Sequence, residues 1–174
     1  MANCMYCSAE IPESSTFCPK CGKKQVKIYT QTFQRGKMTE DQFVDQINRW
    51  FAQYPHVANV KGKFLLHHAG GLMVNKYVLD AFAIEYEVFS GVNDNQYGVV
   101  KLSTTGLMKT TTDALLAKWQ QNNPGAKVLS RDGGVNQRGD AGSLALGGIG
   151  AVNKTQLYVF FKFNREKGIA TALE

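Results

Sequence analysis

A run of apolar residues at helical spacing lies between Thr39 and Pro55. Thr39 and Gln42 match a capping box, which predicts where the helix begins, and Pro55 predicts where it ends. The apolar residues share one helical face, which we expect to be buried. They are Phe43, Ile47, Trp50, Phe51 and Tyr54.

From Val57 onward, apolar and polar residues alternate, which is the pattern of half-buried β-strands. The expected strands cover residues 57–68, 72–79, 82–88, 97–102, 128–129 and 157–163. A second helical stripe interrupts this pattern, with Thr110 or Thr112 as its expected N-cap. That stripe consists of Leu115, Leu116 and Trp119.

The two predicted helices end in similar ways. Pro55 follows Trp50 by five residues, Pro124 follows Trp119 by five residues, and strands come after both. This similarity hints at two copies of a helix-strand-strand unit, although a proline after a helix is also common by chance. The predicted fold class is α+β, with a two-layer domain whose antiparallel sheet carries two helices on one face.

The length of 174 residues allows one ordinary domain and a small module. Hydrophobic residues make up 44% of the chain and charged residues 20%, which is typical of a globular protein with a real core. No apolar run is long enough for a membrane span, and no signal-peptide pattern begins the chain, so we expect a cytoplasmic protein. We divide the chain into a module at 1–24, a connector at 25–38 that can add a short strand, and an α+β domain at 39–174.

All four cysteines lie within the first 21 residues. Cys4 and Cys7 are separated by two residues, Cys18 and Cys21 likewise, and ten residues lie between the pairs. Two-residue spacing turns both thiolates of a pair toward one tetrahedral site, and four thiolates leave no open coordination position. The pattern therefore predicts one structural Zn²⁺. Iron and a pair of disulfides are the alternatives, and a cytoplasmic location disfavours the disulfides.

The residues around the cysteines resemble the short bacterial zinc-ribbon domain over residues 2–24, with Phe17 before the third cysteine and Gly22 after the fourth. The resemblance implies that each cysteine pair forms a zinc knuckle. It also implies that the metal ligands are Cys4, Cys7, Cys18 and Cys21.

The rest of the module is small. We expect Ile11 and Phe17 to form a miniature core beneath the metal, and we expect the module to unfold without zinc. The chain departs from the family at Ser8-Ala9, where glycine is frequent.

The chain has 20 basic and 14 acidic residues, a formal net charge of +6. A zinc ion with four thiolates contributes about −2, which leaves about +4 and only a modest preference for an anionic partner. Two groups of basic residues are candidates for contact with a protein partner or nucleic acid. They are Lys20, Lys23, Lys24 and Lys27 near the cysteines, and Lys162, Arg165 and Lys167 near the C-terminus.

Residues 132–150 contain seven glycines. The segment lacks the Gly-Lys-Ser/Thr ending of a phosphate-binding loop, so we expect a mobile loop or a long hairpin. Its apolar residues would suit docking onto a partner or a neighbouring subunit.

No arrangement of residues in the chain is typical of an enzyme. His67 and His68 are adjacent on a strand and so point to opposite faces. Glu85 and Glu87 share a face, where we expect either a solvated surface or pairing with Lys61 and Lys63 across the sheet. The metal uses every cysteine, which leaves no thiol nucleophile. We therefore expect no catalytic residues and infer no small-molecule substrate.

Two hypotheses follow. The first is a non-catalytic zinc-binding protein, with the ribbon as a structural head and the α+β body binding a protein partner or self-associating. The second is a nucleic-acid-binding protein that uses the two basic groups.

Overall fold

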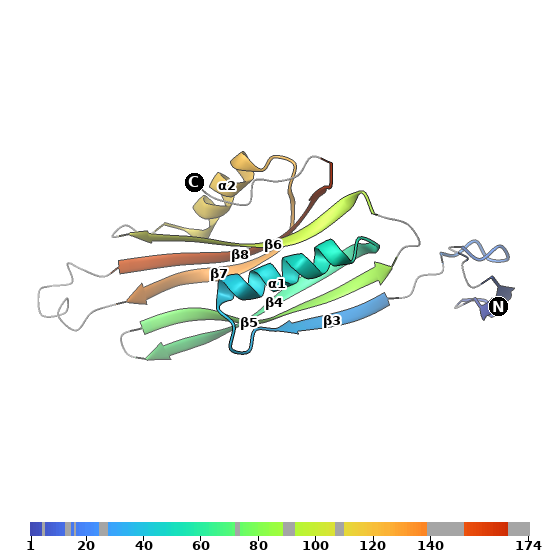
Figure 1. The fold of residues 1–174 in the computed structure, drawn as a ribbon, viewed down its shortest axis with the longest axis horizontal. Coiled ribbons are helices and arrows are strands. Elements are labelled where there is room, and N and C mark those ends of the chain that lie inside the picture. Colours follow the sequence, from blue (N-terminus) through green and yellow to red (C-terminus); the bar gives the residue numbers. More distant parts are fainter. Residues whose placement is uncertain are drawn as a thin grey trace, which may run out of the picture.

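The computed structural model describes residues 1–4, 6–12, 15, 17–24, 28–71, 74–88, 93–106, 110–138 and 152–166. Two short strands, β1 (Ala2–Asn3) and β2 (Glu10–Ile11), pair within the N-terminal module. The body follows it along the chain (Figure 1). Its elements are β3 (Ile28–Gln34), α1 (Glu40–Gln53), β4 (Val57–Gly71), β5 (Val74–Val88), β6 (Asn95–Gly106), α2 (Thr112–Asn122), β7 (Lys127–Arg138) and β8 (Val152–Asn164).

The body consists of two units with the same order of elements, β3-α1-β4-β5 and β6-α2-β7-β8. In each unit the last strand lies between the first and the second and pairs antiparallel with both. The two three-stranded sheets join where β5 pairs with β7. This arrangement agrees with the repeat hinted at by the sequence and adds a leading strand to each copy.

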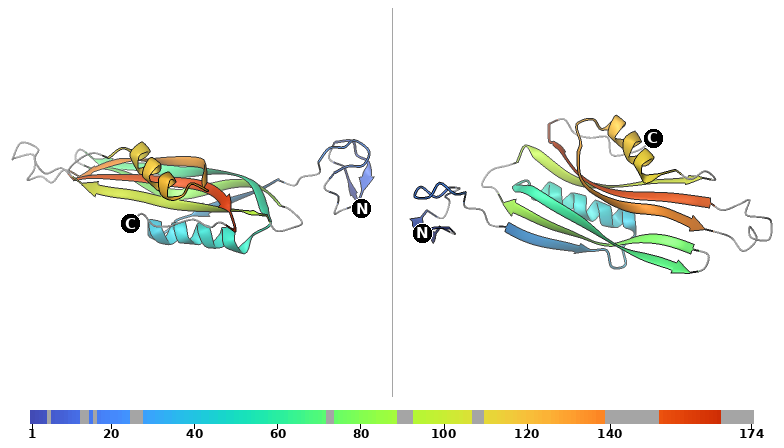
Figure 2. Two further views of the ribbon diagram at one scale, coloured as in Figure 1. Left: turned by 90° about the horizontal axis from the view of Figure 1, so that it is seen from above. Right: turned by 180° about the vertical axis from the view of Figure 1, so that it is seen from behind.

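The α+β class, the antiparallel pairing and the two helices are as predicted, but the helices do not share one face. On β8, Tyr158 and Phe160 belong to the core cluster that includes the buried face of α1. Their neighbours Leu157, Val159 and Phe161 belong to the cluster that includes α2. Because successive residues of a strand point to opposite faces, α1 and α2 cover opposite faces of β8 (Figure 2). The expected two layers are therefore corrected to helices on both sides.

The first helix begins and ends as predicted. Thr39 and Gln42 form the reciprocal capping box, and Tyr54, just before Pro55, is the C-cap. Phe43, Ile47 and Phe51 are buried as expected, whereas Tyr54 is exposed.

The N-cap of α2 corrects a sequence expectation. The cap is Thr111, whose Oγ1 accepts a hydrogen bond from the Ala114 N–H at 3.2 Å, and not Thr110 or Thr112. The carbonyl of Thr110 instead accepts a hydrogen bond from the Thr155 hydroxyl on β8.

Several strands are longer than predicted. The expected strands 72–79 and 82–88 form one strand, β5, in which Asp80 lies at a register shift of the pairing with β4 and pairs with Arg35 and His67. The expected connector contains the seven-residue β3, which pairs with β5, so the sheet of the body begins at Ile28.

The glycine-rich segment begins inside β7, which extends to Arg138. Residues 139–150 of that segment lie outside the described residues.

Aromatic rings fill the core where the two units meet. Phe82 on β5 contacts the rings of Phe33, Phe64 and Phe160, with centroids 4.8 to 6.5 Å away. Gly62 on β4 faces the same rings, and a Cβ at this position would lie 2.6 Å from Phe82 Cζ. Glycine is thus required at position 62 by close packing.

We predict that Gly62→Ala lowers the free energy of unfolding by about 1–3 kcal/mol, because the added methyl group overpacks a rigid core. Gly125→Ala is the matched control, since no atom lies within 4 Å of the Cβ it would add. Urea denaturation measures both variants. Equal stability of the two variants would contradict this packing.

A polar cluster lies between α1 and the sheet. The buried Gln156 donates from Nε2 to Glu40 Oε2 at 2.6 Å and to the Tyr158 hydroxyl, and it accepts from Asn136 Nδ2 at 3.3 Å. Burial would raise the pKa of Glu40, but hydrogen bonds from Tyr158 and Gln156 and the charge of Lys101 outweigh it and lower that pKa. The cluster therefore stabilises the ionised carboxylate of Glu40.

Because the pKa of Glu40 is lower in the folded state, its stabilisation is present above the ordinary carboxyl pKa and is lost as the pH falls through the lowered value. We predict that Glu40→Gln destabilises the protein by about 1–2 kcal/mol at pH 7. This difference from the wild type should shrink in acid. Unfolding followed between neutral and acidic pH tests it, with the exposed Asp45→Asn as control. A difference that does not change with pH would refute the role of Glu40.

Candidate metal centre

Each cysteine pair begins a tight turn with the same backbone hydrogen bonds. The Cys4 N–H donates to the Ala9 carbonyl at 2.8 Å, and the Cys4 carbonyl accepts from the Ser8 N–H at 3.0 Å. In the second turn the Cys18 N–H donates to the Lys23 carbonyl at 2.9 Å, and the Cys18 carbonyl accepts from the Gly22 N–H at 2.8 Å. The two turns are therefore equivalent, as two zinc knuckles require.

The departure at Ser8 does not change the turn. Ser8 has a φ of 55°, and Gly22, at the corresponding position of the second knuckle, has a φ of 68°. Both values lie in the left-handed region, which glycine adopts at little cost and serine adopts with strain. The first knuckle thus keeps its geometry at a conformational cost.

The two turns bring all four sulfurs together. The Sγ atoms of Cys4 and Cys21 are 3.6 Å apart, as are those of Cys7 and Cys18, and all four lie within 4.8 Å of one another. Tetrahedral zinc with bonds near 2.3 Å to sulfur separates its ligands by about 3.8 Å. The separations greatly exceed a disulfide bond of about 2.05 Å. The donor set therefore fits one structural Zn²⁺.

The thiols differ in acidity. Burial would raise the pKa of Cys4, but backbone hydrogen bonds from Tyr6 and Cys7 outweigh it and lower that pKa to about 6. For Cys7, a backbone hydrogen bond from Ala9 acts in the lowering direction, but interaction with Cys4 and burial raise the pKa to about 12. A divalent ion must displace the proton that Cys7 holds, so zinc binding releases protons and weakens as the pH falls.

The core of the module is smaller than expected. Cys4, Cys18 and Ile11 are buried together, with Ala9 and Cys21 packed against them. The expectation that Phe17 joins this core is wrong, because its side chain is 59% exposed. Phe17 instead forms a backbone bridge with Lys24. So few buried side chains leave the metal as the main source of stability.

Those predicted basic residues that the structure describes do not form one continuous basic surface. Lys24 Nζ pairs with Glu87 Oε2 on β5 at 3.2 Å, and Lys23 Nζ lies 4.7 Å from the ring centroid of Tyr6. Lys20 is exposed, whereas Lys162 and Arg165 are half-buried. Two further candidates, Lys27 and Lys167, lie outside the described residues.

The acidic residues of β5 have the predicted partners in part. Lys61 Nζ pairs with Glu85 Oε1 at 2.9 Å, as expected, whereas Glu87 accepts from Asn59 at 2.7 Å and from Lys24. Sequence reasoning missed the contact between Lys24 and Glu87, because it joins residues 63 positions apart.

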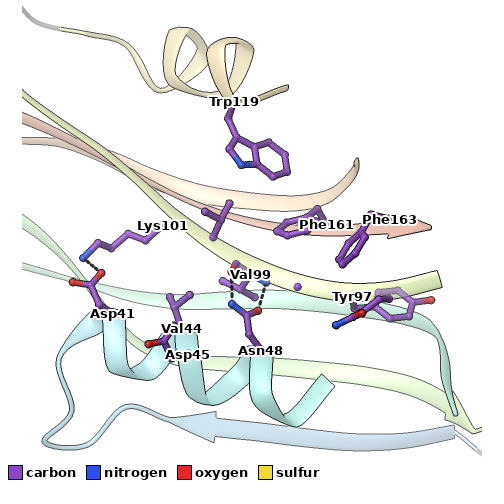
Figure 3. A pocket seen from close by; sticks show the side chains of 13 residues that line it. Asp41, Val44, Asp45, Asn48, Tyr97, Val99, Lys101, Trp119, Phe161 and Phe163 are labelled. Atoms are coloured by element: carbon purple, nitrogen blue, oxygen red, sulfur yellow. Dashed lines mark hydrogen bonds and ion pairs between the residues drawn. The ribbon is translucent and has the colours of Figure 1, made fainter. Parts of the chain in front are cut away.

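A groove of about 390 Å³ lies between α1, β6 and α2. Asn48 of α1 faces β6 there, donating to the Val99 carbonyl at 2.9 Å and accepting from the Val99 N–H at 2.8 Å (Figure 3). Lys101 pairs with Asp41 at 2.5 Å. The lining residues include neither histidine nor cysteine. The sequence did not indicate this groove. Asn48 binds the backbone of Val99, and no sequence pattern shows that a polar helix residue makes such a contact.

Comparison with known proteins agrees with this geometry. Residues 3–25 match the family model of the zinc-ribbon domain. The N-terminal module is therefore a zinc ribbon, and its four clustered cysteines are consistent with one structural zinc ion. The chain matches no curated protein and no solved structure.

Across the described residues, neither helix has the length and apolar character needed to cross a bilayer.

We predict that Ser8→Gly tightens zinc binding about fivefold, because relief of left-handed strain is worth about 1 kcal/mol and binding is coupled to folding. Gly22→Ser is the matched reverse change and should weaken binding by a similar factor. Competition with a chelator measures both affinities. Weaker binding by Ser8→Gly would show that the first knuckle does not carry this strain.

Proposed function

We propose that the protein is a non-catalytic, zinc-binding interaction protein. The ribbon is its structural head, and the α+β body binds a protein partner or a second copy of the chain. The ribbon contributes no catalysis in this proposal, because four thiolates fill the coordination sphere of zinc and leave no position for water or substrate.

The position of the exposed apolar side chains carries this proposal. Within the described residues, the large hydrophobic side chains that are exposed lie almost entirely in the ribbon and at the end of the body where β3 begins and β5 and α1 end (Figure 1). They are Met1, Tyr6, Phe17, Ile28, Tyr29, Tyr54 and Val88, with Leu65 as the exception. Apolar surface concentrated in one region marks an interaction site.

Aromatic contacts make this end of the body rigid. Tyr29 stacks on Tyr86 at 5.7 Å between ring centroids, Tyr86 meets Trp50 at 5.5 Å, and Trp50 stacks on Tyr54 at 4.7 Å. These rings come from β3, β5 and α1. Aromatic side chains held by their neighbours lose little entropy on binding and often dominate interface energies.

Nucleic-acid binding is the second candidate. It is favoured by Lys23 beside the exposed Tyr6 ring, since a base can stack on such a ring while the lysine contacts phosphate. The pairing of Lys24 with Glu87 weighs against it, because that lysine already has an anionic partner.

A pull-down from the native host with the full, zinc-loaded chain tests the proposal. We predict that a captured protein, or the chain itself, is lost with Tyr54→Ser and retained with Leu65→Ser, and that nuclease treatment has no effect. Capture that nuclease abolishes, together with binding to labelled DNA or RNA that falls steeply with salt, would replace the proposal with the second candidate. Neither capture nor self-association would refute it.

A further inference from the structure

β3 is an edge strand whose outer side has no partner strand among the described residues. It pairs with β5 along all seven of its residues and ends the strand order on that side of the sheet. Every residue of β3 except Phe33 is exposed. Such an edge presents a row of backbone N–H and C=O groups that can pair with another strand.

The edges on β6 and β4 each carry a feature that disfavours pairing with another strand. On β6, the side-chain amide of Asn48 occupies both backbone groups of Val99 (Figure 3). On β4, the exposed Lys63 supplies a charge that disfavours pairing between copies, next to Lys61, which pairs with Glu85. β3 has no charged residue, and the side-chain amide that binds its backbone is its own Gln31, which donates to the Thr32 carbonyl at 3.4 Å.

The sequence of β3 is neutral. Ile28–Gln34 reads IYTQTFQ and contains no charged residue and no proline. A chain with a formal charge of +6 repels its own copies, so two copies can approach most easily at an uncharged surface. An uncharged, β-prone edge is also prone to aggregation unless something covers it.

We propose that β3 pairs antiparallel with β3 of a second copy, which joins two sheets into one across a twofold axis. This inference rests on the proposed function and names its self-associating branch. Full overlap of the two strands places Gln31 opposite Gln31 of the other copy. In this register Tyr29 lies opposite Phe33, and the reverse pair forms on the other side of the axis.

The side chains at this edge are self-complementary. Phe33 lines an open groove of about 650 Å³ between β3 and α1, together with Met38 and Trp50. Tyr29 and Phe33 are four residues apart on a strand whose pairing has no register shift, so both lie on the face of the groove. Pairing therefore places the exposed ring of each Tyr29 over the groove of the other copy.

The helical side of the groove also permits symmetric contact. It is formed by glutamines and a single charged residue: Gln42, Gln46, Arg49 and Gln53. Antiparallel pairing of the strands places the two α1 helices on the same face of the joined sheet, and each row brings one positive charge, that of Arg49.

Substitutions that introduce charge at Gln31, on the twofold axis, test the proposal. Gln31→Lys and Gln31→Glu each place like charges opposite one another, so we predict that each variant weakens dimerisation of the zinc-loaded chain at least about tenfold. Mixing the two variants in equal amounts places opposite charges at the same position and should restore the dimer. Light scattering with analytical ultracentrifugation measures the association.

Ser103→Lys and Ser103→Glu, at an exposed position of β6, are the controls for net charge and should leave the dimer unchanged. Circular dichroism verifies that each variant is folded. Hydrogen exchange of residues 28–34 supplies a readout that needs no variant, because their outward amides should become protected as the protein concentration rises.

Two results would overturn the inference: a wild-type chain that stays monomeric at every concentration, or Gln31→Lys that dimerises as well as the wild type. If the chain is monomeric but a captured protein still depends on Tyr54, this inference fails and the proposed function stands. If nothing is captured and no dimer forms, both fail.

Discussion

The body depends on the burial of β8 on both of its faces. Its residues Leu157–Phe161 are all apolar and at most 2% exposed, and successive side chains enter the cores under α2 and α1 in turn. A strand with both faces buried needs cover on each side. The two helices supply that cover, and β6 and β7 satisfy its backbone. The position of each helix therefore follows from this one strand.

The ribbon is stabilised by a different interaction. Its core contains little beyond Ile11 and the cysteines, so burial of apolar surface alone would not hold it folded. Four thiolates around zinc provide the missing free energy, and a close sulfur cluster without the metal would retain protons on some thiols. The ion pair between Lys24 and Glu87 is a side-chain contact that links the ribbon to the body. In our account each part keeps its own source of stability, and the apolar surface near their junction is available for association.

Local patterns predicted local structure well. The capping box at Thr39, the stop at Pro55 and the ligand spacing of the cysteines depend on residues close together in the chain, and the structure contains all three. The placement of the helices was not predicted correctly, because residues 157–163 were interpreted as a half-buried strand, whereas Tyr158 and Phe160 make its second face apolar and buried as well. The continuous apolar run of β8 was the signal that could have corrected this.

Other differences depend on distant residues that no local pattern contains. Asp80 lies at a register shift inside β5, where Arg35 and His67 pair with it, and Asn48 binds the edge of β6 from 51 residues away. Phe17 was predicted to lie in the core because it is a large apolar residue, but the ribbon is too small to bury it. Ser8 departs from the glycine that is frequent in zinc ribbons, yet its backbone adopts the same left-handed conformation as Gly22. The sequence thus predicted the cysteine cluster of the metal site, but it did not predict the surfaces that we propose for association.

Removal of zinc from the intact chain tests most directly whether the two parts are stabilised independently. Both tryptophans, Trp50 and Trp119, lie in the body, so their fluorescence reports on the body, and backbone amide resonances of residues 3–25 report on the ribbon. We expect a strong chelator to collapse the ribbon resonances into the unfolded range while the thermal unfolding midpoint of the body, followed by tryptophan fluorescence, stays the same. A ribbon that stays folded without metal, or a body that unfolds with it, would contradict the account.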